Sequence, residues 1–296
     1  DTQGKELIQD PFTKEVIGVR AETGGKEKKI RARKGVILST GGIEFNEKLK
    51  RQFFKCYPMK FYGWKYNTGD GVAMAQKVGA DLWNMSNMCG NSCMWFPDDP
   101  ANAGHSAMVS TGNYIWVNKF GSRFINERDS RNDPHKGWFL FSEFDLNKAT
   151  FPCIPHYLVF DETGRLAGPL DPFGRSDPPT LGRRVLPPEL GGHDAWSEDN
   201  SVEIEKGWIK KGNTLEELAA AIGDPMEAAT LKASVKTYNG YCSAGADAEF
   251  GRDARSMAPV ETPPFYAVPL YPGLVSTTGG PAINEKHQVL DPDEKP

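Results

Sequence analysis

The sequence predicts a mixed fold of the α/β and α+β kind, in which a small antiparallel sheet, a buried strand and short helices precede a second, α+β domain. Three observations predict it. Residues 5–9, 15–22 and 28–33 alternate apolar and polar side chains, residues 35–38 are a short apolar run, and two capping boxes follow residue 213. With 39% hydrophobic and 25% charged residues, the 296 residues can bury a core in about two domains.

The first predicted element is a three-stranded antiparallel meander. Its strands are residues 5–9, 15–22 and 28–33, and Thr13-Lys14 and Gly24-Gly25 supply the turns between them. These segments are local in sequence, so hairpin connections suffice to pair them.

The apolar run at residues 35–38 predicts a strand buried on both faces of a parallel sheet. Such a strand would deliver Gly41 and Gly42 to the carboxyl edge of the sheet. Open α/β sheets bind ligands at that edge, and glycine lets the backbone approach a flat cofactor. A plain turn is the alternative interpretation of the glycine pair.

Two helices are predicted next. Asn46 can cap the first, in which Leu49 and Phe53 share a face. Residues 71–79 form the second, and Asp70 stands where a carboxylate can cap it. The apolar stripe of this second helix is expected at Val72, Ala73, Ala75 and Val78.

Composition excludes several classes of protein. The net charge of -4 argues against nucleic acid as the main partner, and no apolar run approaches the roughly 20 residues of a membrane span. The five scattered cysteines favour reduced thiols and hence a cytoplasmic setting. Cys89, Cys93 and His105 could be a metal half-site, but no second ligand pair follows, so no metal is expected.

From residue 93 to about residue 262 the composition changes, and we expect a second domain there. Residues 168–192 are rich in Gly and Pro and predict irregular chain. Thr214-x-x-Glu217 and Asp224-Pro225-x-Glu227 predict two helix starts, the second with proline at the first helical position. The expected apolar faces are Leu218 and Ile222 in the first helix, and Leu231, Val235 and Tyr238 in the second.

Four motifs in this order resemble those of one enzyme family: Thr40-Gly41-Gly42, Thr68-Gly69-Asp70-Gly71, Asn126-Glu127 with Arg131, and Thr278-Gly279-Gly280. The family is that of the FAD-dependent fumarate reductase and succinate dehydrogenase flavoproteins, which includes the 3-oxosteroid dehydrogenases. The resemblance covers nearly the whole chain. It implies an FAD-binding domain at residues 1–92, a mobile capping domain at 93–262, and a return to the FAD-binding domain at 263–296.

The resemblance also implies which residues contact FAD: Thr40, Gly41, Gly42, Asp70, Gly71, Gly279 and Gly280. For Asp70, helix capping is the alternative role. The family's Gly-x-Gly-x-x-Gly fingerprint is missing, since the nearest string, Gly69 to Met74, has methionine in place of the third glycine. We therefore expect an internal fragment of a flavoprotein that does not retain FAD by itself.

Arg131 is the predicted catalytic residue. In fumarate reductases an arginine four residues after the Asn-Glu pair protonates the substrate carbon while the flavin delivers hydride, and Arg131 stands at that spacing. An arginine can act as an acid only if a relay resupplies its proton. Glu127, Arg128 and Asp129 are candidates for such a relay or for simple salt bridges, and a charged loop after a hairpin is the alternative.

The expected reaction changes a carbon–carbon bond next to a carbonyl in a small-molecule substrate. The His-Pro-Thr, Thr-Glu and His-Thr motifs of dicarboxylate-reducing members are absent, since residues 87–89, 108–111 and 276–280 read Asn-Met-Cys, Met-Val-Ser-Thr and Ser-Thr-Thr-Gly-Gly. Fumarate and succinate are therefore not expected. An apolar substrate wall, or simply core, is predicted from Trp83, Met85, Met88, Met94, Trp95 and Phe96.

Three other interpretations stay open. The first is dehydrogenation of a 3-oxosteroid-like ring, whose proton-abstracting tyrosine would be Tyr114, Tyr266 or a residue of another segment. The second is a non-catalytic binding or assembly module derived from a flavoprotein, and the third is an excerpt without a function of its own. A folded excerpt would still have an incomplete sheet, whose exposed edges predict a homodimer.

Overall fold

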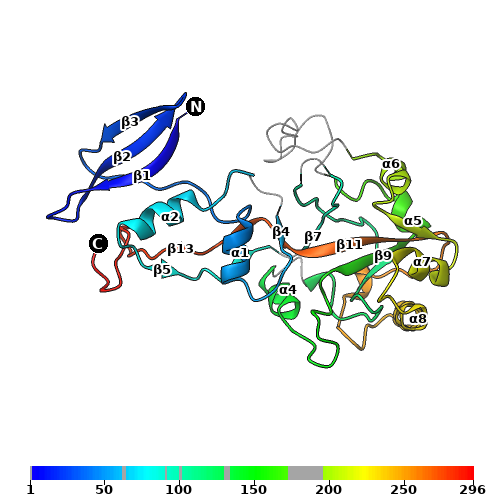
Figure 1. The fold of residues 1–296 in the computed structure, drawn as a ribbon. Helices are drawn as coiled ribbons and strands as arrows, with labels where there is room; N and C mark the ends of the chain where they lie inside the picture. The colour runs from blue at the N-terminus through cyan, green and yellow to red at the C-terminus, as the bar shows by residue number, and fades with distance from the viewer. Residues whose placement is uncertain (1, 62–64, 91, 100–101, 130–133, 173–195) are drawn as a thin grey trace. The chain divides into compact units, whose positions relative to one another are not determined.

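The computed structural model describes residues 2–61, 65–90, 92–99, 102–129, 134–172 and 196–296 (Figure 1). The chain forms two compact units. Unit 1 contains residues 1–55, 66–88 and 276–296, and unit 2 contains residues 56–65 and 89–275. The division concerns compactness alone, and the domain bounds expected from the sequence stay predictions.

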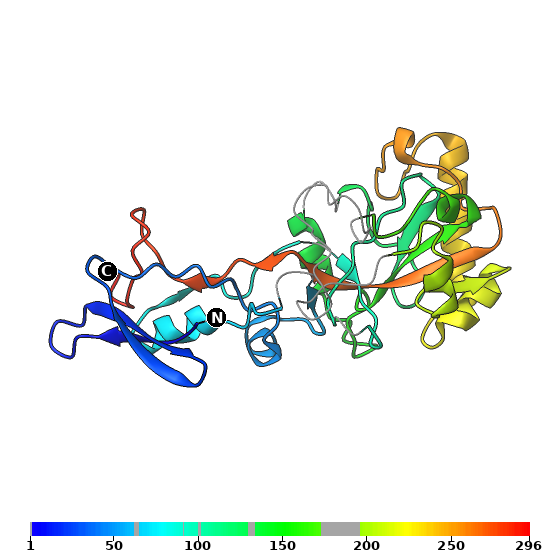
Figure 2. The same ribbon diagram turned by 90° about the horizontal axis from the view of Figure 1, so that it is seen from above.

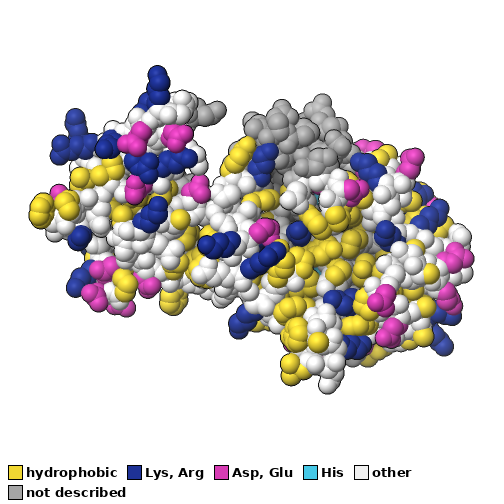
Figure 3. All heavy atoms as spheres, in the orientation of Figure 1, with side chains coloured by type: hydrophobic (Ala, Val, Ile, Leu, Met, Phe, Trp, Pro, Cys, Tyr) yellow, Lys and Arg dark blue, Asp and Glu magenta, His cyan; other side chains and the backbone are white. Residues whose placement is uncertain are grey.

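Unit 1 begins with the expected meander. Strands β1 (Gln3–Gln9), β2 (Val16–Thr23) and β3 (Lys26–Arg31) pair antiparallel in the order β1-β2-β3. Leu7 and Ala21 are buried, whereas every residue of β3 is exposed. Lysine and arginine side chains accordingly gather on the surface over this sheet (Figure 3).

The two predicted helices of unit 1 are present. Helix α1 (Glu47–Phe53) begins at Asn46, whose side-chain oxygen accepts the Leu49 N–H at 3.0 Å. Helix α2 (Asp70–Lys77) contacts β1, because Met74 reaches toward Gly4. The buried stripe of α2 differs from the expected one, because Met74 is buried and Ala73 is exposed.

The predicted strand at residues 35–38 is wrong. No strand is assigned there, and Ile37 is 92% exposed. A strand of a parallel sheet forms only when neighbouring strands accept and donate its ladder hydrogen bonds. The described residues of unit 1 place no strand beside this segment, which therefore belongs to no sheet.

The remainder of unit 1 consists of short strand pairs. β5 (Leu82–Trp83) pairs antiparallel with β13 (Gly280–Pro281), and β6 (Met88–Cys89) pairs with β12 (Ser276–Thr277). The Asp81 N–H donates to the Leu290 carbonyl at 2.9 Å, which ties the C-terminal segment to the start of β5. These pairs bring residues about 200 positions apart into one small layer.

Unit 2 is built around one long strand, β11 (Phe265–Leu274) (Figure 2). Within the described residues its sheet has the order β10-β11-β9-β8, and β4 and β7 also pair with β11. The partner strands are β4 (Lys60–Phe61), β7 (Ser92–Met94), β8 (Tyr114–Val117), β9 (His156–Asp161) and β10 (Lys210–Gly212). The pairing with β9 is antiparallel and in register from Phe265↔Asp161 to Leu270↔His156.

Alternation along these strands separates two cores. One face contributes Trp116, Leu158 and Val268 to a cluster with Phe96, Trp196 and other apolar residues. The opposite face contributes Ile115, Val159 and Ala267 to a cluster with the helices α7 (Leu215–Ile222) and α8 (Ala228–Ala244). A period of two residues per strand explains why neighbours in sequence lie in different cores.

The capping-box predictions have mixed outcomes. Helix α7 begins as expected, because the Thr214 hydroxyl oxygen accepts the Glu217 N–H at 3.1 Å. Helix α8 begins at Ala228 with Glu227 as N-cap, so the proposed start at Asp224-Pro225 is wrong. The Glu227 carboxylate accepts the Thr230 hydroxyl at 2.8 Å, not a backbone N–H, and Pro225 precedes the helix.

The apolar faces of these helices are as predicted, with Leu218, Leu231, Val235 and Tyr238 buried. The other helices of unit 2 are short: α4 (Pro134–Phe141), α5 (Glu162–Leu166), α6 (Ser201–Glu205) and the 3-10 helix η2 (Ala254–Ser256). No helix among the residues that the structure describes could cross a lipid bilayer.

Strand β8 is followed by a tight loop at residues 117–123. Its closing contact is a single bridge between Val117 and Arg123, and the Asn118 N–H donates to the Ser122 carbonyl at 2.8 Å. Most of residues 168–192 lie outside the described chain, so the expectation of irregular structure there stays a prediction.

Candidate flavin-binding site

The segments that carry the predicted cofactor residues meet in unit 1. Thr40 lies against the start of helix α2, because a Cβ added to Gly71 would fall 2.0 Å from the Thr40 hydroxyl oxygen. Real Cβ atoms do not approach oxygen so closely, so any larger residue at position 71 would force Thr40 to move. Thr40 and Gly71, predicted separately to contact one cofactor, are therefore adjacent.

Gly42 lies in a similarly close contact with the returning chain. An added Cβ there would fall 2.1 Å from the Thr277 hydroxyl oxygen. That hydroxyl oxygen accepts the Ile43 N–H at 3.0 Å, which fixes residues 277–280 beside the Gly41-Gly42 turn. The two glycine motifs, more than 230 residues apart in sequence, are thus held side by side.

The backbone conformation at position 41 favours glycine, because its φ of 72° lies in the left-handed region. An added Cβ there would also fall 2.2 Å from the Asn67 amide oxygen. Next to Asn67, the Thr68 hydroxyl donates to the Asp70 carboxylate at 3.0 Å. These contacts connect the Gly41 turn to the Thr68-Gly69-Asp70-Gly71 motif.

Asp70 does not cap helix α2. The N-cap is Gly69, and no side-chain hydrogen bond caps the helix. The Asp70 carboxylate lies exposed in the first turn, where the partial positive charge of the helix N-terminus favours an anion. The capping alternative is therefore wrong, and the proposed contact with FAD stays a prediction.

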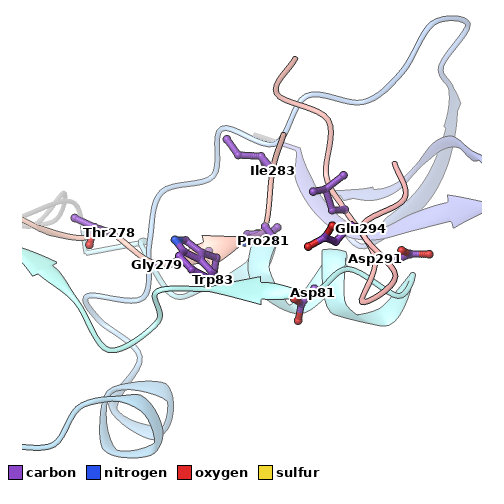
Figure 4. Close-up of a pocket in the computed structure, with 11 residues that line it drawn as sticks. Asp81, Trp83, Thr278, Gly279, Pro281, Ile283, Asp291 and Glu294 are labelled. Atoms are coloured by element: carbon purple, nitrogen blue, oxygen red, sulfur yellow. The ribbon is translucent and has the colours of Figure 1, made fainter. Parts of the chain in front are cut away.

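Gly279 and Gly280 line a pocket of about 570 Å³ in unit 1 (Figure 4). Trp83 lies beside Gly279 and Pro281 at one end of the view, and Asp291 and Glu294 lie toward the other. A Cβ added to Gly279 would fall 2.4 Å from the Met85 Cα, whereas one added to Gly280 would meet nothing within 4 Å. The pocket wall is thus tightly packed behind Gly279 and open at Gly280.

This arrangement fits a flat, hydrogen-bonding cofactor. Gly41, Gly42 and Gly71 present bare backbone where neighbouring side chains leave no room for a Cβ. The Glu44 side chain is buried beside them, and its Oε2 atom has no hydrogen-bond partner among the described residues. Buried polar atoms in proteins normally have a partner, so this acceptor is suited to a donor group of a bound molecule.

Arg131 lies outside the described residues, so its role stays a prediction. The motif that precedes it is deeply buried in unit 2. Glu127 is fully buried and forms salt bridges with Arg123, at 2.9 Å, and with Arg252, at 3.3 Å. Its Oε1 atom also accepts the Trp116 N–H at 3.1 Å. Salt bridging, one of the two roles expected for Glu127, is therefore present.

Asp247 completes this ionic network. It accepts from Arg123 Nη2 at 2.7 Å. Burial raises the pKa of Asp247, but the hydrogen bonds from Arg123 and from the Phe250 and Arg252 backbone N–H groups together outweigh burial and lower it to about 2. The pKa of Arg123 is raised in turn by Glu127 and Asp247 despite burial, so both groups stay charged near neutral pH.

The proposed apolar wall divides between core and surface. Met85, Met88, Met94 and Phe96 are buried, Trp83 is 73% exposed, and Trp95 lies under the Lys60 ammonium at 3.5 Å. Of the six residues, Trp83 lines the described pocket. The alternative that such residues are core is therefore correct for the four that are buried.

Sequence patterns missed a buried histidine cluster in unit 2. His105 lies between two buried carboxylates, with Nε2 2.9 Å from Asp99 Oδ2 and Nδ1 3.3 Å from Asp171 Oδ2. The rings of Trp196 and Trp208 lie 5.4 Å and 5.8 Å from it. The sequence separation of 66 residues between His105 and Asp171 left no local pattern to detect.

Glu44 was missed for a similar reason, although a charged residue between Ile43 and Phe45 is a weak sequence signal of a buried polar group. No group of three or more His, Cys, Asp or Glu in the described part of the chain could hold a metal ion. The pairing of Cys89 and Cys93 with His105 as a half-site is not seen there. All five cysteines are free thiols.

Comparison with known proteins shows the family of this chain. Residues 1–296 match the model of a family described as "FAD binding domain". The chain belongs to this family. FAD is therefore the cofactor of the proteins to which it is related, and the resemblance to FAD-dependent fumarate reductase and succinate dehydrogenase flavoproteins is confirmed.

Curated relatives of this chain are oxidoreductases. The chain is 28% identical over 302 residues to an NADH:acrylate oxidoreductase of Vibrio harveyi, covering 99% of this chain and 26% of the relative. It is 28% identical over 309 residues to a urocanate reductase of Eggerthella lenta, with 100% and 43% covered. It is also 28% identical to a 3-oxosteroid 1-dehydrogenase of Mycolicibacterium smegmatis, and the match covers 94% of this chain and 48% of the relative.

Solved structures agree with the predicted mixed fold. A 3-ketosteroid delta1-dehydrogenase of Sterolibacterium denitrificans matches all of this chain and 52% of its own, with 26% identity and a TM-score of 0.78. A flavocytochrome c3 fumarate reductase matches with 24% identity and a TM-score of 0.60, covering 100% of this chain and 44% of its own, which shows the fold alone. The chain thus spans about half or less of the length of these relatives.

Proposed function

We propose that this chain supplies part of the FAD site and the capping domain of an oxidoreductase that acts on a carbon–carbon bond next to a carbonyl. The observation that carries the proposal is the meeting of Thr40–Gly42, Asp70-Gly71 and residues 277–280 in unit 1. The names of the relatives support it, because they act on acrylate, fumarate, urocanate and 3-oxosteroids.

FAD, when bound, carries the hydride in such chemistry. The chain's own part is to hold the cofactor with Thr40, Gly41, Gly42, Asp70, Gly71, Gly279 and Gly280, and to place Arg131 at the substrate. Arg131 follows a segment that is firmly held, because Asn126 Oδ1 accepts the N–H groups of Arg128 and Asp129 at 3.0 Å and 3.4 Å. In this proposal Arg131 donates the proton in alkene reduction.

Dehydrogenation of a 3-oxosteroid-like ring is the second candidate, and the match to the 3-ketosteroid dehydrogenase structure favours it. Of the two tyrosines named as candidates, neither Tyr266 nor Tyr114 suits the proton-abstracting role. The Tyr266 hydroxyl donates to Glu162 at 2.7 Å, and burial together with Glu162 raises its pKa to about 12. Tyr114 is 1% exposed within the core. The base would have to come from another segment.

Kinetics on the full-length flavoprotein tests the role of Arg131. The Arg131→Ala variant should lose at least about a hundredfold in turnover of an alkene conjugated to a carbonyl, the low end of what a general acid contributes. Arg255→Ala is the matched control, since Arg255 is exposed and paired with Asp253. Unchanged turnover in Arg131→Ala would remove Arg131 from the mechanism.

A spectrum separates an enzyme from a non-catalytic module. FAD is added to the purified flavoprotein, excess is removed, and the visible flavin band is recorded. A bound flavin that is reduced or reoxidised by substrate supports the oxidoreductase. A colourless protein with no turnover supports the binding or assembly module instead.

A further inference from the structure

Glu44 occupies an unusual position for a charged residue. Glu44 is only 1% exposed. Its side chain lies against Gly42, because a Cβ added to Gly42 would fall 2.7 Å from Oε1 and 3.0 Å from Oε2. Oε1 accepts the Thr277 backbone N–H at 2.7 Å and the Thr277 hydroxyl at 3.3 Å. One carboxylate oxygen therefore fastens the returning chain to the Gly41-Gly42 turn.

The second oxygen has no such use. Oε2 is buried and has no hydrogen-bond partner among the residues that the structure describes. A buried carboxylate oxygen without a donor costs free energy, because the water it loses is not replaced. A neutral amide oxygen could also accept from Thr277, so the contact of Oε1 with Thr277 does not by itself require a carboxylate.

The surroundings of Oε2 indicate which donor it meets. The carboxylate lies beside Gly42 and contacts Thr277, and these two residues belong to the two segments that form the proposed flavin site. FAD has N–H groups on its ring systems and hydroxyl groups on its sugar portions, all of which can donate to a carboxylate. A charge-assisted hydrogen bond of this kind is about twice as strong as a neutral one.

We propose that Glu44 is an FAD-binding residue, in which Oε1 fastens residues 277–280 to the Gly41-Gly42 turn and Oε2 accepts a hydrogen bond from an N–H or O–H group of FAD. This inference rests on the proposed function, since it requires FAD at this site. It predicts that the charge of Glu44 destabilises the cofactor-free protein and strengthens cofactor binding.

The test compares Glu44→Gln and Glu44→Ala with wild type in the full-length flavoprotein that contains these 296 residues. Affinity is measured by equilibrium titration with FAD, followed through flavin fluorescence, which detects weak binding that desalting would lose. Thermal unfolding without FAD is the second readout. Glu15→Gln is the matched control, because Glu15 is an exposed glutamate of the same unit.

Glutamine keeps an acceptor for Thr277 but turns an amide N–H₂ toward the donor of FAD. Glu44→Gln should therefore weaken FAD binding about tenfold or more, while the FAD-free unfolding temperature stays equal or rises. Glu44→Ala should weaken binding and lower the unfolding temperature, because the contact of Oε1 with Thr277 is lost. Glu15→Gln should change neither quantity.

The outcomes separate this inference from the proposed function. If wild type binds FAD and Glu44→Gln binds it equally well, Oε2 faces a buried water or nothing, and the Glu44 contact is overturned while the flavin site stands. If wild type shows no binding at any FAD concentration, the proposed flavin site in this chain fails, and the Glu44 contact fails with it. A lower unfolding temperature in Glu44→Gln would also contradict the inference.

Discussion

Arg123 and Glu127 form a double hydrogen bond inside unit 2, with Nε 2.9 Å from Oε1 and Nη2 3.0 Å from Oε2. Both side chains are buried, and Arg252 donates to the same carboxylate at 3.3 Å. A buried pair of this kind adds little net stability, but removing one partner leaves an uncompensated charge. The network therefore fixes the segment that leads to Arg131.

The first prediction follows from this network. Glu127→Gln should lower the free energy of unfolding of unit 2 by about 3–5 kcal/mol, because Arg123 and Arg252 lose their shared counter-charge in a buried site. Urea unfolding measures the change. Glu216→Gln is the control, since Glu216 forms an exposed ion pair with Lys232 and its loss should be hard to detect. Equal stabilities of the two variants would contradict the prediction.

The second prediction concerns the pH dependence of unit 2 through His105. Burial lowers the pKa of His105, but the hydrogen bonds to Asp171 and Asp99 outweigh it and raise the pKa above the ordinary value of 6.5. The folded state then binds a proton more tightly than the unfolded state. The added stability is fully present below about pH 6.5 and is lost as pH rises through the folded pKa.

Thermal unfolding from about pH 5 to pH 9 measures this slope. His105→Gln should lower the unfolding temperature most at the acid end and flatten the decline at the alkaline end. A variant that differs from wild type by a constant amount at every pH would show that His105 does not carry the dependence.

The third prediction has the opposite sign and concerns His156. Burial lowers its pKa to about 3. The neutral ring interacts with the Cys153 carbonyl at 3.0 Å and with the Ser92 hydroxyl at 3.1 Å. As pH falls, the unfolded chain takes up the His156 proton at a higher pH than the folded chain does. The contribution of His156 to the stability of the fold is therefore full above about pH 6.5 and is lost as pH falls toward 3.

His156→Phe should therefore lose part of the acid destabilisation that wild type shows, because phenylalanine takes no proton and can stack on Phe141, 5.0 Å away. The measurement is the difference in unfolding free energy between variant and wild type across the acid range. If the difference in unfolding free energy between variant and wild type does not change with pH, His156 is not a neutral buried residue that takes up a proton on unfolding.

The fourth prediction concerns the exposed apolar chain at residues 35–38. Ile37 is 92% exposed on a segment that joins no strand among the described residues, and an exposed apolar segment outside a sheet can pair with another chain. We expect the 296-residue chain to self-associate through it and Ile37→Lys to shift the population toward monomer. Phe12→Lys, at an equally exposed turn, should not. Light scattering that finds wild type monomeric at high concentration would exclude this dimer.

The same segment shows what the sequence could and could not predict. The meander and the start of α1 depend on neighbours in sequence, such as Asn46 and Leu49, and were predicted correctly. Residues 35–38 have the composition of a buried strand, but a parallel strand depends on distant partners, which no local pattern contains.

The candidate site divides in the same way. Glycine motifs identified the segments that meet, because close backbone contact leaves a residue-type signature at Gly42 and Gly71. Glu44 and its contact to Thr277, 233 positions away, left none, since a single glutamate in a sequence does not reveal its burial. The start of α8 was missed because two nearby segments, at Asp224 and Glu227, compete to begin it.

The fifth prediction separates the two predicted flavin contacts Gly42 and Gly280. Gly42→Ala places a methyl group 2.1 Å from the Thr277 hydroxyl oxygen, so it should destabilise unit 1 by about 1–3 kcal/mol even without FAD. Gly280→Ala meets nothing within 4 Å and should leave the FAD-free unfolding temperature nearly unchanged.

In FAD titrations both variants should bind more weakly than wild type, for different reasons. Gly42→Ala distorts the join between the glycine turn and the returning chain, whereas Gly280→Ala fills space in the pocket where the cofactor is proposed to lie. A Gly280→Ala variant with wild-type affinity would place FAD elsewhere than against Gly280. Because its fold is undisturbed, that result would concern the cofactor's position alone, which Gly42→Ala cannot test.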